Sequence, residues 1–277
     1  MDMSDVPQPA AQVYRALPVR EVRSGQWREV QDCVAEEVPV ALEFNGVAHA
    51  VMMATPDDLE DFACGFSVTE GIVDTVSQIY DCECTSSERG YTVHLTIAAS
   101  CFHRLKEMRR NLTGRTGCGL CGTESLAHAV RGPLALTGGG SFDARSVARA
   151  VAGLRTRQLL LAVTGATHAA AWCTADGQIA LLREDVGRHN ALDKLAGALV
   201  RSRDLPGEGF VVITSRASYE MVQKTASVGV SLLVAVSGVT ALAVEVAQDA
   251  GLTLVGFARG DDGSIYSHPE RLKLDAQ

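Results

Sequence analysis

Two cysteines in a glycine-rich segment carry the most reactive chemistry that the sequence offers. Cys118 and Cys121 lie within Thr116-Gly117-Cys118-Gly119-Leu120-Cys121-Gly122. Glycine adopts positive φ and lets the backbone approach other groups closely, so such a loop can bring its thiols to a partner. Residues 106–115, just before it, contain one lysine and three arginines. Nearby cations favour the thiolate, which is the nucleophilic form of cysteine, so either cysteine is a candidate reactive thiol.

A Cys-x-x-Cys pair also occurs in zinc sites, thioredoxin-like dithiols and disulfides. A zinc site usually needs a second ligand pair at matching spacing, and the best remaining pair, Cys82 and Cys84, lies on an expected strand. A thioredoxin-like motif opens a helix after a buried strand, whereas residues 104–115 are polar and helical in pattern. A disulfide is disfavoured where thiols stay reduced. Transfer of sulfur as a cysteine persulfide is the sharpest interpretation, and the motif alone does not exclude the others.

Composition limits the classes of protein and partner. The 277 residues are enough for one large domain or two ordinary ones. A net charge of −8 argues against a general nucleic-acid-binding protein, which needs a basic face. No apolar stretch is long enough to span a bilayer, and the acidic N-terminus has no apolar signal core. We therefore expect a cytoplasmic protein with reduced thiols and no nucleic-acid or membrane partner.

The first half of the sequence predicts a flexible arm followed by a smaller α+β domain. Residues 1–20 are expected to be the arm. Residues 38–52 indicate two strands that turn at Asn45-Gly46, since a tight hairpin turn needs positive φ. Thr55 and Pro56 are typical of an N-cap and first position of a helix. The alternating residues 91–97 indicate a strand. We expect this domain to span residues 21–137 and to end in the Cys-x-x-Cys loop.

The second half, residues 138–277, predicts an α/β domain. One helix with apolar residues from Val147 to Leu161 is expected after a cap at Ser141 or Asp143, followed by a hairpin that turns at Asp176-Gly177. Strands and helices then alternate over residues 210–214, 219–228, 232–236, 241–250 and 252–257. Such a βαβαβ unit has parallel strands. A hairpin leading into it predicts a three-layer α/β sandwich with a mixed sheet.

Ligands of open α/β sheets bind beyond the carboxyl ends of the strands. The segments at these ends bring hydroxyl groups, Arg216 and Arg259 to one edge, where two helices begin. Helix N-termini and arginines both bind phosphate, which predicts a phosphorylated ligand. Ser218 and Thr240 equally fit the N-cap positions of the two helices. The sequence lacks the phosphate-loop and dinucleotide glycine motifs, which disfavours an NTPase or a dehydrogenase.

A second polar cluster, residues 184–194, follows a strand and opens a helix. His189 and Asp193 are four residues apart and share a helix face. The cluster fits either the rim of a ligand site or a capped helix start with surface charges. His168 likewise fits either a functional histidine or a buried, hydrogen-bonded one.

Taken together, these motifs resemble the FdhD family, sulfurtransferases that formate dehydrogenase activity requires. The resemblance extends from Glu37 almost to the C-terminus. The matching segments are Asn45-Gly46 and residues 54–60, 65–71, 118–122, 164–170, 184–194, 216–222 and 251–259. Ser237-Gly238-Val239-Thr240 departs from the Ala-Pro pair that the family commonly has before this threonine.

The resemblance implies a specific reaction. Sulfur would be taken from a cysteine desulfurase as a cysteine persulfide and passed to the molybdenum of bis(molybdopterin guanine dinucleotide), the bound substrate, for a formate dehydrogenase. Cys118 would carry the persulfide and Cys121 would assist, with no permanent metal in the protein. The residues that match the segment contacting the nucleotide end are Phe257, Ala258, Arg259, Gly260, Asp261 and Asp262. The resemblance also implies a cytidine-deaminase-like second domain and a homodimer.

Two other functions remain compatible with the sequence. The first is a molybdenum-cofactor-binding chaperone that transfers no sulfur. The second is a zinc hydrolase of the deaminase type, which needs a His/Cys-x-Glu segment and a Pro-Cys-x-x-Cys segment. His168-Ala169-Ala170 lacks the glutamate and no proline precedes Cys118, so we disfavour the hydrolase.

Overall fold

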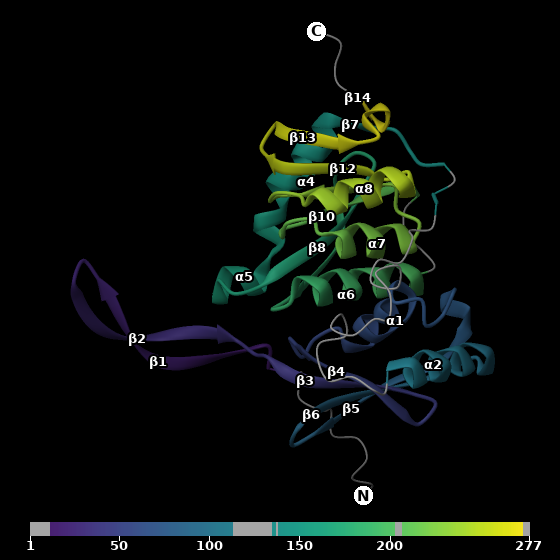
Figure 1. The fold of residues 1–277 in the computed structure, drawn as a ribbon. Coiled ribbons are helices and arrows are strands. Elements are labelled where there is room, and N and C mark those ends of the chain that lie inside the picture. The colour runs from purple at the N-terminus through teal and green to yellow at the C-terminus, as the bar shows by residue number, and fades with distance from the viewer. Residues whose placement is uncertain (1–11, 113–134, 137, 203–206, 274–277) are drawn as a thin grey trace, which may run out of the picture.

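The structure, a computed structural model, describes residues 12–112, 135–136, 138–202 and 207–273 (Figure 1). Cys118 and Cys121 lie outside the described residues. The domain boundary expected at residue 138 stays a prediction, because residues 113–134 and 137 are also outside them. Within the described residues, no helix has the length and apolar character needed to cross a membrane.

A two-stranded antiparallel ribbon extends away from the body of the molecule (Figure 1). It consists of β1 (Tyr14–Arg23) and β2 (Gln26–Ala35), which turn at Ser24 and Gly25, both with positive φ. The arm expected over residues 1–20 therefore ends earlier, since Tyr14 already lies in β1, and a domain start at residue 21 falls inside this strand. The sequence did not predict the strand β1, because β1 is stabilised by backbone hydrogen bonds to β2, which comes later in the chain.

A four-stranded sheet of order β4-β3-β6-β5 forms the next unit. Its strands are β3 (Val38–Phe44), β4 (Val47–Ala54), β5 (Ile79–Ser87) and β6 (Gly90–Ile97). The predicted hairpin at Asn45-Gly46 and the strand over residues 91–97 are confirmed. The helices α1 (Leu59–Thr69) and α2 (Ala99–Leu112) share one hydrophobic cluster with the sheet, in which Phe44 and Phe62 are fully buried.

The predicted start of the first helix is wrong by several residues. The N-cap of α1 is Asp58, which has a positive φ of 52°, and not Thr55. Thr55 is held by the other half of the chain instead. Its backbone N–H donates to Asp185 Oδ2 over 3.0 Å and its hydroxyl accepts from the N–H of Val186 over 3.2 Å. These tertiary hydrogen bonds override the local capping signal.

A six-stranded mixed sheet of order β13-β12-β11-β10-β8-β9 forms the larger unit. The parallel strands are β10 (Gly209–Ile213), β11 (Leu232–Ala235) and β12 (Thr253–Arg259). The antiparallel strands are β8 (His168–Thr174), β9 (Ile179–Asp185) and β13 (Asp262–Ser267). The mixed sheet and its parallel strands are confirmed, whereas β13 was not predicted. The short strands β7 (Phe142–Asp143) and β14 (Leu272–Lys273) form a separate pair.

Helices cover both faces of the six-stranded sheet, which gives three layers (Figure 1). One face packs on α6 (Arg188–Arg201), α7 (Tyr219–Ser227) and α8 (Ala241–Ala250), and the other on α4 (Ala144–Arg157). Asp143 caps α4 by accepting from Arg145 N over 2.8 Å, as one of the two predicted caps.

The single helix expected from Val147 to Leu161 is two helices. A break at Gln158 separates α4 from α5 (Leu159–Thr164). The Glu184 carboxylate accepts hydrogen bonds from the backbone N–H groups of Leu160 and Leu161, each over 2.8 Å. It thereby satisfies the free donors of a new helix start, which a periodicity argument does not detect.

Candidate functional site

The loops after the three parallel strands lie side by side at one edge of the six-stranded sheet. Ala217 N donates to Gly238 O over 3.0 Å, and Thr240 N donates to Ala217 O over 3.1 Å. Phe257 N donates to Ser237 O over 2.9 Å, which ties the third segment to the second. These three segments at the carboxyl ends of the strands, residues 214–218, 236–240 and 257–262, are here called the rim. Two of them lead into helices, and together they hold the residues predicted to bind a phosphorylated ligand.

Two arginines of the rim have guanidinium groups that form no ion pair within the described residues. Arg216 follows β10 and Arg259 ends β12, and both are exposed. Neither guanidinium group makes an ion pair or hydrogen bond with another described residue. Free guanidinium groups beside the N-termini of α7 and α8 attract anions and can bind phosphate oxygens in pairs. Asp261 lies in the turn that follows β12 and Asp262 begins β13, and both are exposed and add hydrogen-bond acceptors.

The two predicted N-cap residues of the rim differ in the hydrogen bonding of their hydroxyl groups. Thr240 caps α8 by accepting a hydrogen bond from Ala243 N over 3.3 Å. Ser218 occupies the N-cap position of α7, but its Oγ is buried and has no hydrogen-bond partner within the described residues. The Nε atom of Arg188, in the first turn of α6, is likewise buried without a partner there. A buried polar atom without a partner is costly, so both atoms are sites for ligand hydrogen bonds.

Phe257 has an unusual backbone conformation at the rim. Its φ is 52°, in the left-handed region that non-glycine residues rarely adopt, and its side chain is half exposed. The ring lies against Gly238, where a Cβ would be 3.0 Å from the ring atom Cζ. An exposed aromatic face that is held in a strained conformation can stack on a planar ligand group. By contrast, Ala258 is buried in the core, so only its backbone is available to a ligand.

Most of the cluster at residues 184–194 has a structural role. Asp185 is fully buried, accepts hydrogen bonds from Gly187 N and Asn190 Nδ2, and pairs with Lys194 over 2.8 Å. Asp193 is also buried and pairs with Lys224 over 2.9 Å. The interpretation as a capped helix start with surface charges is therefore wrong for Asp185, because the N-cap of α6 is Gly187, without a side-chain cap, and the Asp185 carboxylate is buried. The carboxylate instead accepts from Thr55 N and so joins the two units.

The histidines of this region border the rim. His189 Nε2 lies 2.7 Å from Glu220 Oε2 in the first turn of α7, and this close contact lowers the pKa of Glu220. His168 begins β8, next to the end of β10. Burial, followed by the positive charge of Arg188, lowers the pKa of His168. The lowered pKa favours the neutral imidazole, which can donate and accept a hydrogen bond.

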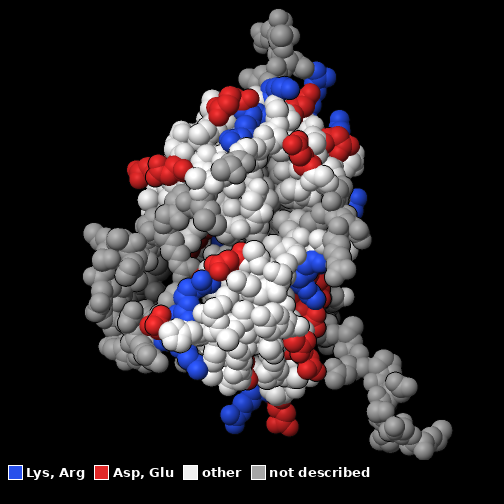
Figure 2. All heavy atoms as spheres, turned by 90° about the vertical axis from the view of Figure 1, so that its right-hand side faces the viewer, with Lys and Arg blue, Asp and Glu red and all other residues white. Residues whose placement is uncertain are grey.

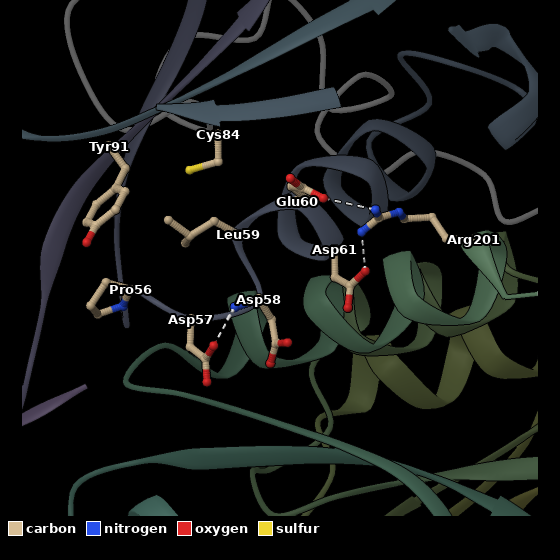
Figure 3. A pocket seen from close by; sticks show the side chains of 9 residues that line it. All are labelled: Pro56, Asp57, Asp58, Leu59, Glu60, Asp61, Cys84, Tyr91 and Arg201. Carbon is tan, nitrogen blue, oxygen red and sulfur yellow. Dashed lines mark hydrogen bonds and ion pairs between the residues drawn. The ribbon is translucent and has the colours of Figure 1, made fainter. Parts of the chain in front are cut away.

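A separate cavity of about 340 Å³ lies between the start of α1 and the four-stranded sheet (Figure 3). It was not predicted, and its lining includes none of the predicted site residues. The lining residues are Pro56, Asp57, Asp58, Leu59, Glu60, Asp61, Cys84, Tyr91 and Arg201. Burial raises the pKa of the Cys84 thiol, and Glu60 raises it further, so this thiol is a poor nucleophile. The described residues contain no group of three or more His, Cys, Asp or Glu side chains that could hold a metal ion.

On the side of the molecule drawn in Figure 2, the charged side chains do not form a surface that would bind a polyanion. Among the described residues visible there, acidic and basic side chains are interspersed, and no continuous basic track is formed. Phosphate backbones need such a track, so this side offers nucleic acid no obvious groove.

Comparison with known proteins finds one family over most of the chain. The model of the FdhD/NarQ family matches residues 35–273. A Variovorax paradoxus protein named sulfur carrier protein FdhD is 56% identical over 273 residues, which cover 98% of each chain. A protein of the same name from Cupriavidus necator is 56% identical, over 95% of this chain and 91% of its own.

The fold has a known counterpart. The crystal structure of a protein described as a formate dehydrogenase accessory protein from Desulfotalea psychrophila aligns with a TM-score of 0.72. The alignment covers 95% of this chain and 100% of the other, at 23% sequence identity. At that identity the likeness shows that the fold is shared.

Proposed function

The chain belongs to the FdhD/NarQ family, and from this membership we propose that it carries sulfur for the maturation of a formate dehydrogenase. Its cysteine pair would receive sulfur from a cysteine desulfurase as a persulfide. The acceptor would be the molybdenum of bis(molybdopterin guanine dinucleotide), which the protein binds as a substrate. A compartment that keeps thiols reduced is needed for such chemistry, which is consistent with the cytoplasm.

The loading step is a thiol exchange at Cys118. The Cys118 thiolate attacks the outer sulfur of the donor persulfide, a new S–S bond forms, and the donor cysteine leaves as a thiolate. The outer sulfur is now attached to Cys118 without net oxidation or reduction. Cys121, three residues along the chain, would assist as the second thiol of the pair. Attack of the Cys121 thiolate on the inner sulfur would then release the outer sulfur as sulfide to the molybdenum and leave a Cys118–Cys121 disulfide, so the two thiols would supply the two electrons.

The composition of the rim supports the proposed binding of the guanine dinucleotide. The rim combines the exposed ring of Phe257 with two guanidinium groups and a Ser218 hydroxyl that have no partner among the described residues. Arginine and helix N-termini suit the diphosphate of a guanine dinucleotide arm, and an aromatic ring suits the base. Asp261 and Asp262 can accept hydrogen bonds from the N–H groups of guanine, while Gly260, with φ 57°, allows their tight turn.

Two further features of the family resemblance belong to the proposal. The six-stranded unit would be a cytidine-deaminase-like domain whose ligand edge holds a nucleotide in place of a free nucleoside. The protein would also be a homodimer, which presents two rims to a cofactor with two guanine dinucleotide arms.

Intact-mass spectrometry tests sulfur transfer directly. The wild type, Cys118→Ala and Cys121→Ala are each incubated with a cysteine desulfurase and cysteine. We expect a one-sulfur adduct on the wild type that disappears in Cys118→Ala, while all three proteins bind GDP equally. An adduct that persists in Cys118→Ala contradicts the assigned acceptor. Without any adduct on the wild type, the chaperone that binds the cofactor and transfers no sulfur becomes the better explanation.

A further inference from the structure

Two thiol groups meet where α1 packs on β5, outside the site described above. Cys64 lies in the middle of α1 and is 2% exposed, whereas Cys82 lies on β5 with its side chain half-buried. Cys82 Sγ is 3.9 Å from the carbonyl oxygen of Glu60, which precedes Cys64 by one turn of the helix. The two thiol groups are hydrogen-bonded to each other, and both cysteines are free. Helix and strand therefore approach closely enough for the two sulfur atoms to interact directly.

The contact makes the two thiols chemically unequal. The Cys82 thiol donates a hydrogen bond that lowers the pKa of Cys64 against the effect of burial, and the positive charge of Arg201 lowers it further. The same hydrogen bond, followed by burial, raises the pKa of Cys82. Cys173 shows how a buried thiol behaves without such a contact, because burial raises its pKa to about 12. The pair thus combines a nucleophilic thiolate at Cys64 with a neighbouring thiol that can react with it.

The pair lies beside the cavity of Figure 3, which gives a small molecule a way to approach it. Glu60, whose carbonyl oxygen contacts Cys82, lines this cavity from α1, and Cys84, two residues further along the strand, lines it from β5. The cavity volume of about 340 Å³ is several times the share of about 30 Å³ that a water molecule has in the liquid. A reagent little larger than water can therefore reach the thiols, although Cys64 is closed to bulky ones.

Cys82 suits a disulfide with Cys64 better than one with Cys84. Cys82 and Cys84 alternate with an outward-facing residue on one strand, so their Cα atoms are about 6.6 Å apart and their Cβ atoms point in parallel directions. A disulfide needs Cβ atoms that approach each other to about 3.8 Å. Cys64 meets this need because it faces Cys82 from another element, with the sulfur atoms already in contact.

We propose that Cys64 and Cys82 form a reversible oxidation site, at which a peroxide generates a disulfide between α1 and β5. The Cys64 thiolate attacks hydrogen peroxide, an S–O bond forms as the O–O bond breaks, and the leaving hydroxide takes a proton from solvent. Cys82 then loses its proton and attacks the Cys64 sulfur, so that the S–S bond forms and the S–O bond breaks with release of water. The two thiols lose two electrons in all, and the peroxide is reduced to two water molecules.

Peptide mapping of the full chain tests this site. The double variant Cys118→Ala with Cys121→Ala is used, so that the thiols of the proposed sulfur carrier do not compete for the oxidant. The protein is treated with hydrogen peroxide, its remaining thiols are alkylated, and it is cut by a protease that cleaves after glutamate. Cleavage after Glu60, Glu70 and Glu83 releases the cysteines of α1 and β5 on separate peptides.

These cuts place Cys64, Cys82 and Cys84 on three different peptides, so the linked pair is identified by mass. We expect the peptides of Cys64 and Cys82 to be joined, to weigh less than the two reduced peptides by two hydrogen atoms, and to separate in dithiothreitol. The link should form at least about tenfold faster than Cys173 is oxidised, because Cys173 has a raised pKa. A link from Cys64 to Cys84, or a pair that reacts no faster than Cys173, would overturn the proposal.

Single variants in the same background provide the controls. Cys64→Ala and Cys82→Ala should each abolish the link, whereas Cys84→Ala, the matched change on the same strand, should retain it. Urea unfolding of the parent protein gives a readout that does not depend on these variants. Closing the loop between the two cysteines should lower its unfolding equilibrium constant about tenfold or more in the oxidised form. Sulfur loading of Cys118 in a chain that carries only Cys64→Ala should be unchanged, which separates this site from the proposed function.

Discussion

Gly65 of α1 and Gly197 of α6 lie against each other's helix backbone where the two helices cross. A Cβ at Gly65 would collide with the carbonyl oxygen of Asp193, and a Cβ at Gly197 would collide with that of Asp61. The crossing therefore brings the helix axes closer than side chains would allow. Because α1 belongs to the four-stranded unit and α6 to the six-stranded unit, it also fixes how the two units pack.

Replacing Gly197 by alanine tests this contact. Since the neighbouring atoms are backbone and cannot rotate away, we expect Gly197→Ala to lower the free energy of unfolding by about 3 kcal/mol or more. Gly153→Ala is the matched control, because its nearest neighbour would be the end of the Ile179 side chain at 3.5 Å. That change, in the interior of α4, should raise stability by about 0.5–1 kcal/mol. Urea unfolding of both variants measures the difference, and equal stabilities would rule out the tight crossing.

A buried ion pair within the six-stranded unit, Lys224–Asp193, also contacts the end of α1 in the four-stranded unit. Lys224 Nζ lies 2.9 Å from Asp193 Oδ1, 2.8 Å from Glu70 Oε1 and 3.0 Å from Thr69 Oγ1. Lys224→Met leaves the Asp193 carboxylate buried without its counter-charge, and we expect a loss of about 3–5 kcal/mol. The double variant Lys224→Met with Asp193→Leu removes both charges and should lose less than the sum of the single losses. Additive losses in urea unfolding would contradict a direct interaction.

The sequence predicted those parts of the fold in which local signals and tertiary contacts agree. The turn at Asn45-Gly46 needs positive φ at two residues, and Asn-Gly meets that need wherever the hairpin packs. The buried apolar runs of β10, β11 and β12 are strands because apolar residues alone cover both of their faces. These elements determine where the rim lies, so its position followed from the sequence.

The remaining features depend on residues far away in the chain. Thr55 fits an N-cap, but its hydroxyl and N–H are hydrogen-bonded to the segment that follows β9. The break at Gln158 arises from Glu184, and the ribbon from pairing with residues beyond the expected arm. At the rim, the sequence placed Ser218 correctly at a helix start but could not show that its hydroxyl has no partner. The exposure of Phe257 was also hidden, because a positive φ at a phenylalanine has no sequence signal.

The His189–Glu220 pair gives the protein a specific pH dependence. The close contact with His189 holds the pKa of Glu220 below the ordinary value of 4.5, so the folded state favours the ionised carboxylate. This contribution to stability is present above pH 4.5 and is lost as the pH falls through the lowered pKa. Glu220→Gln should therefore flatten the acid side of the stability profile. Unfolding measured between pH 3 and pH 6 checks this, with the exposed Glu245→Gln on α8 as the control. Parallel profiles for wild type and Glu220→Gln would exclude the pair as a source of acid sensitivity.

Phe257 should show opposite effects on stability and binding. Glycine adopts positive φ without the cost of about 1 kcal/mol that a side chain incurs, and the half-exposed ring contributes little burial. We therefore expect Phe257→Gly to be as stable as the wild type or slightly more so. If the ring stacks on guanine, the affinity for GDP should fall about tenfold or more, whereas Phe257→Tyr should retain it. Calorimetric titration and thermal unfolding measure the two effects, and unchanged GDP affinity in Phe257→Gly would reject the stacking role.

Ser218 and Thr240 provide the sharpest comparison, because both begin a helix at the rim but only one hydroxyl caps its helix. Thr240→Ala removes the bond from Ala243 N and should cost about 1 kcal/mol of stability. Ser218→Ala removes a buried hydroxyl without a partner in the described residues, so stability should be unchanged or higher.

GDP affinity should show the opposite pattern to stability: it should fall in Ser218→Ala and stay unchanged in Thr240→Ala. If Ser218 Oγ donates to a phosphate of the nucleotide, Ser218→Ala should weaken GDP binding about tenfold, since hydrogen bonds to charged groups contribute about 1.5–3 kcal/mol. Arg216→Ala should weaken it at least as much, whereas Arg155→Ala, an exposed arginine of α4, should have no effect. Titration with GDP and thermal unfolding of each variant supply both measurements. Loss of stability without loss of affinity in Ser218→Ala would show that its hydroxyl serves the helix, and the phosphate site would then have to be placed elsewhere on the rim.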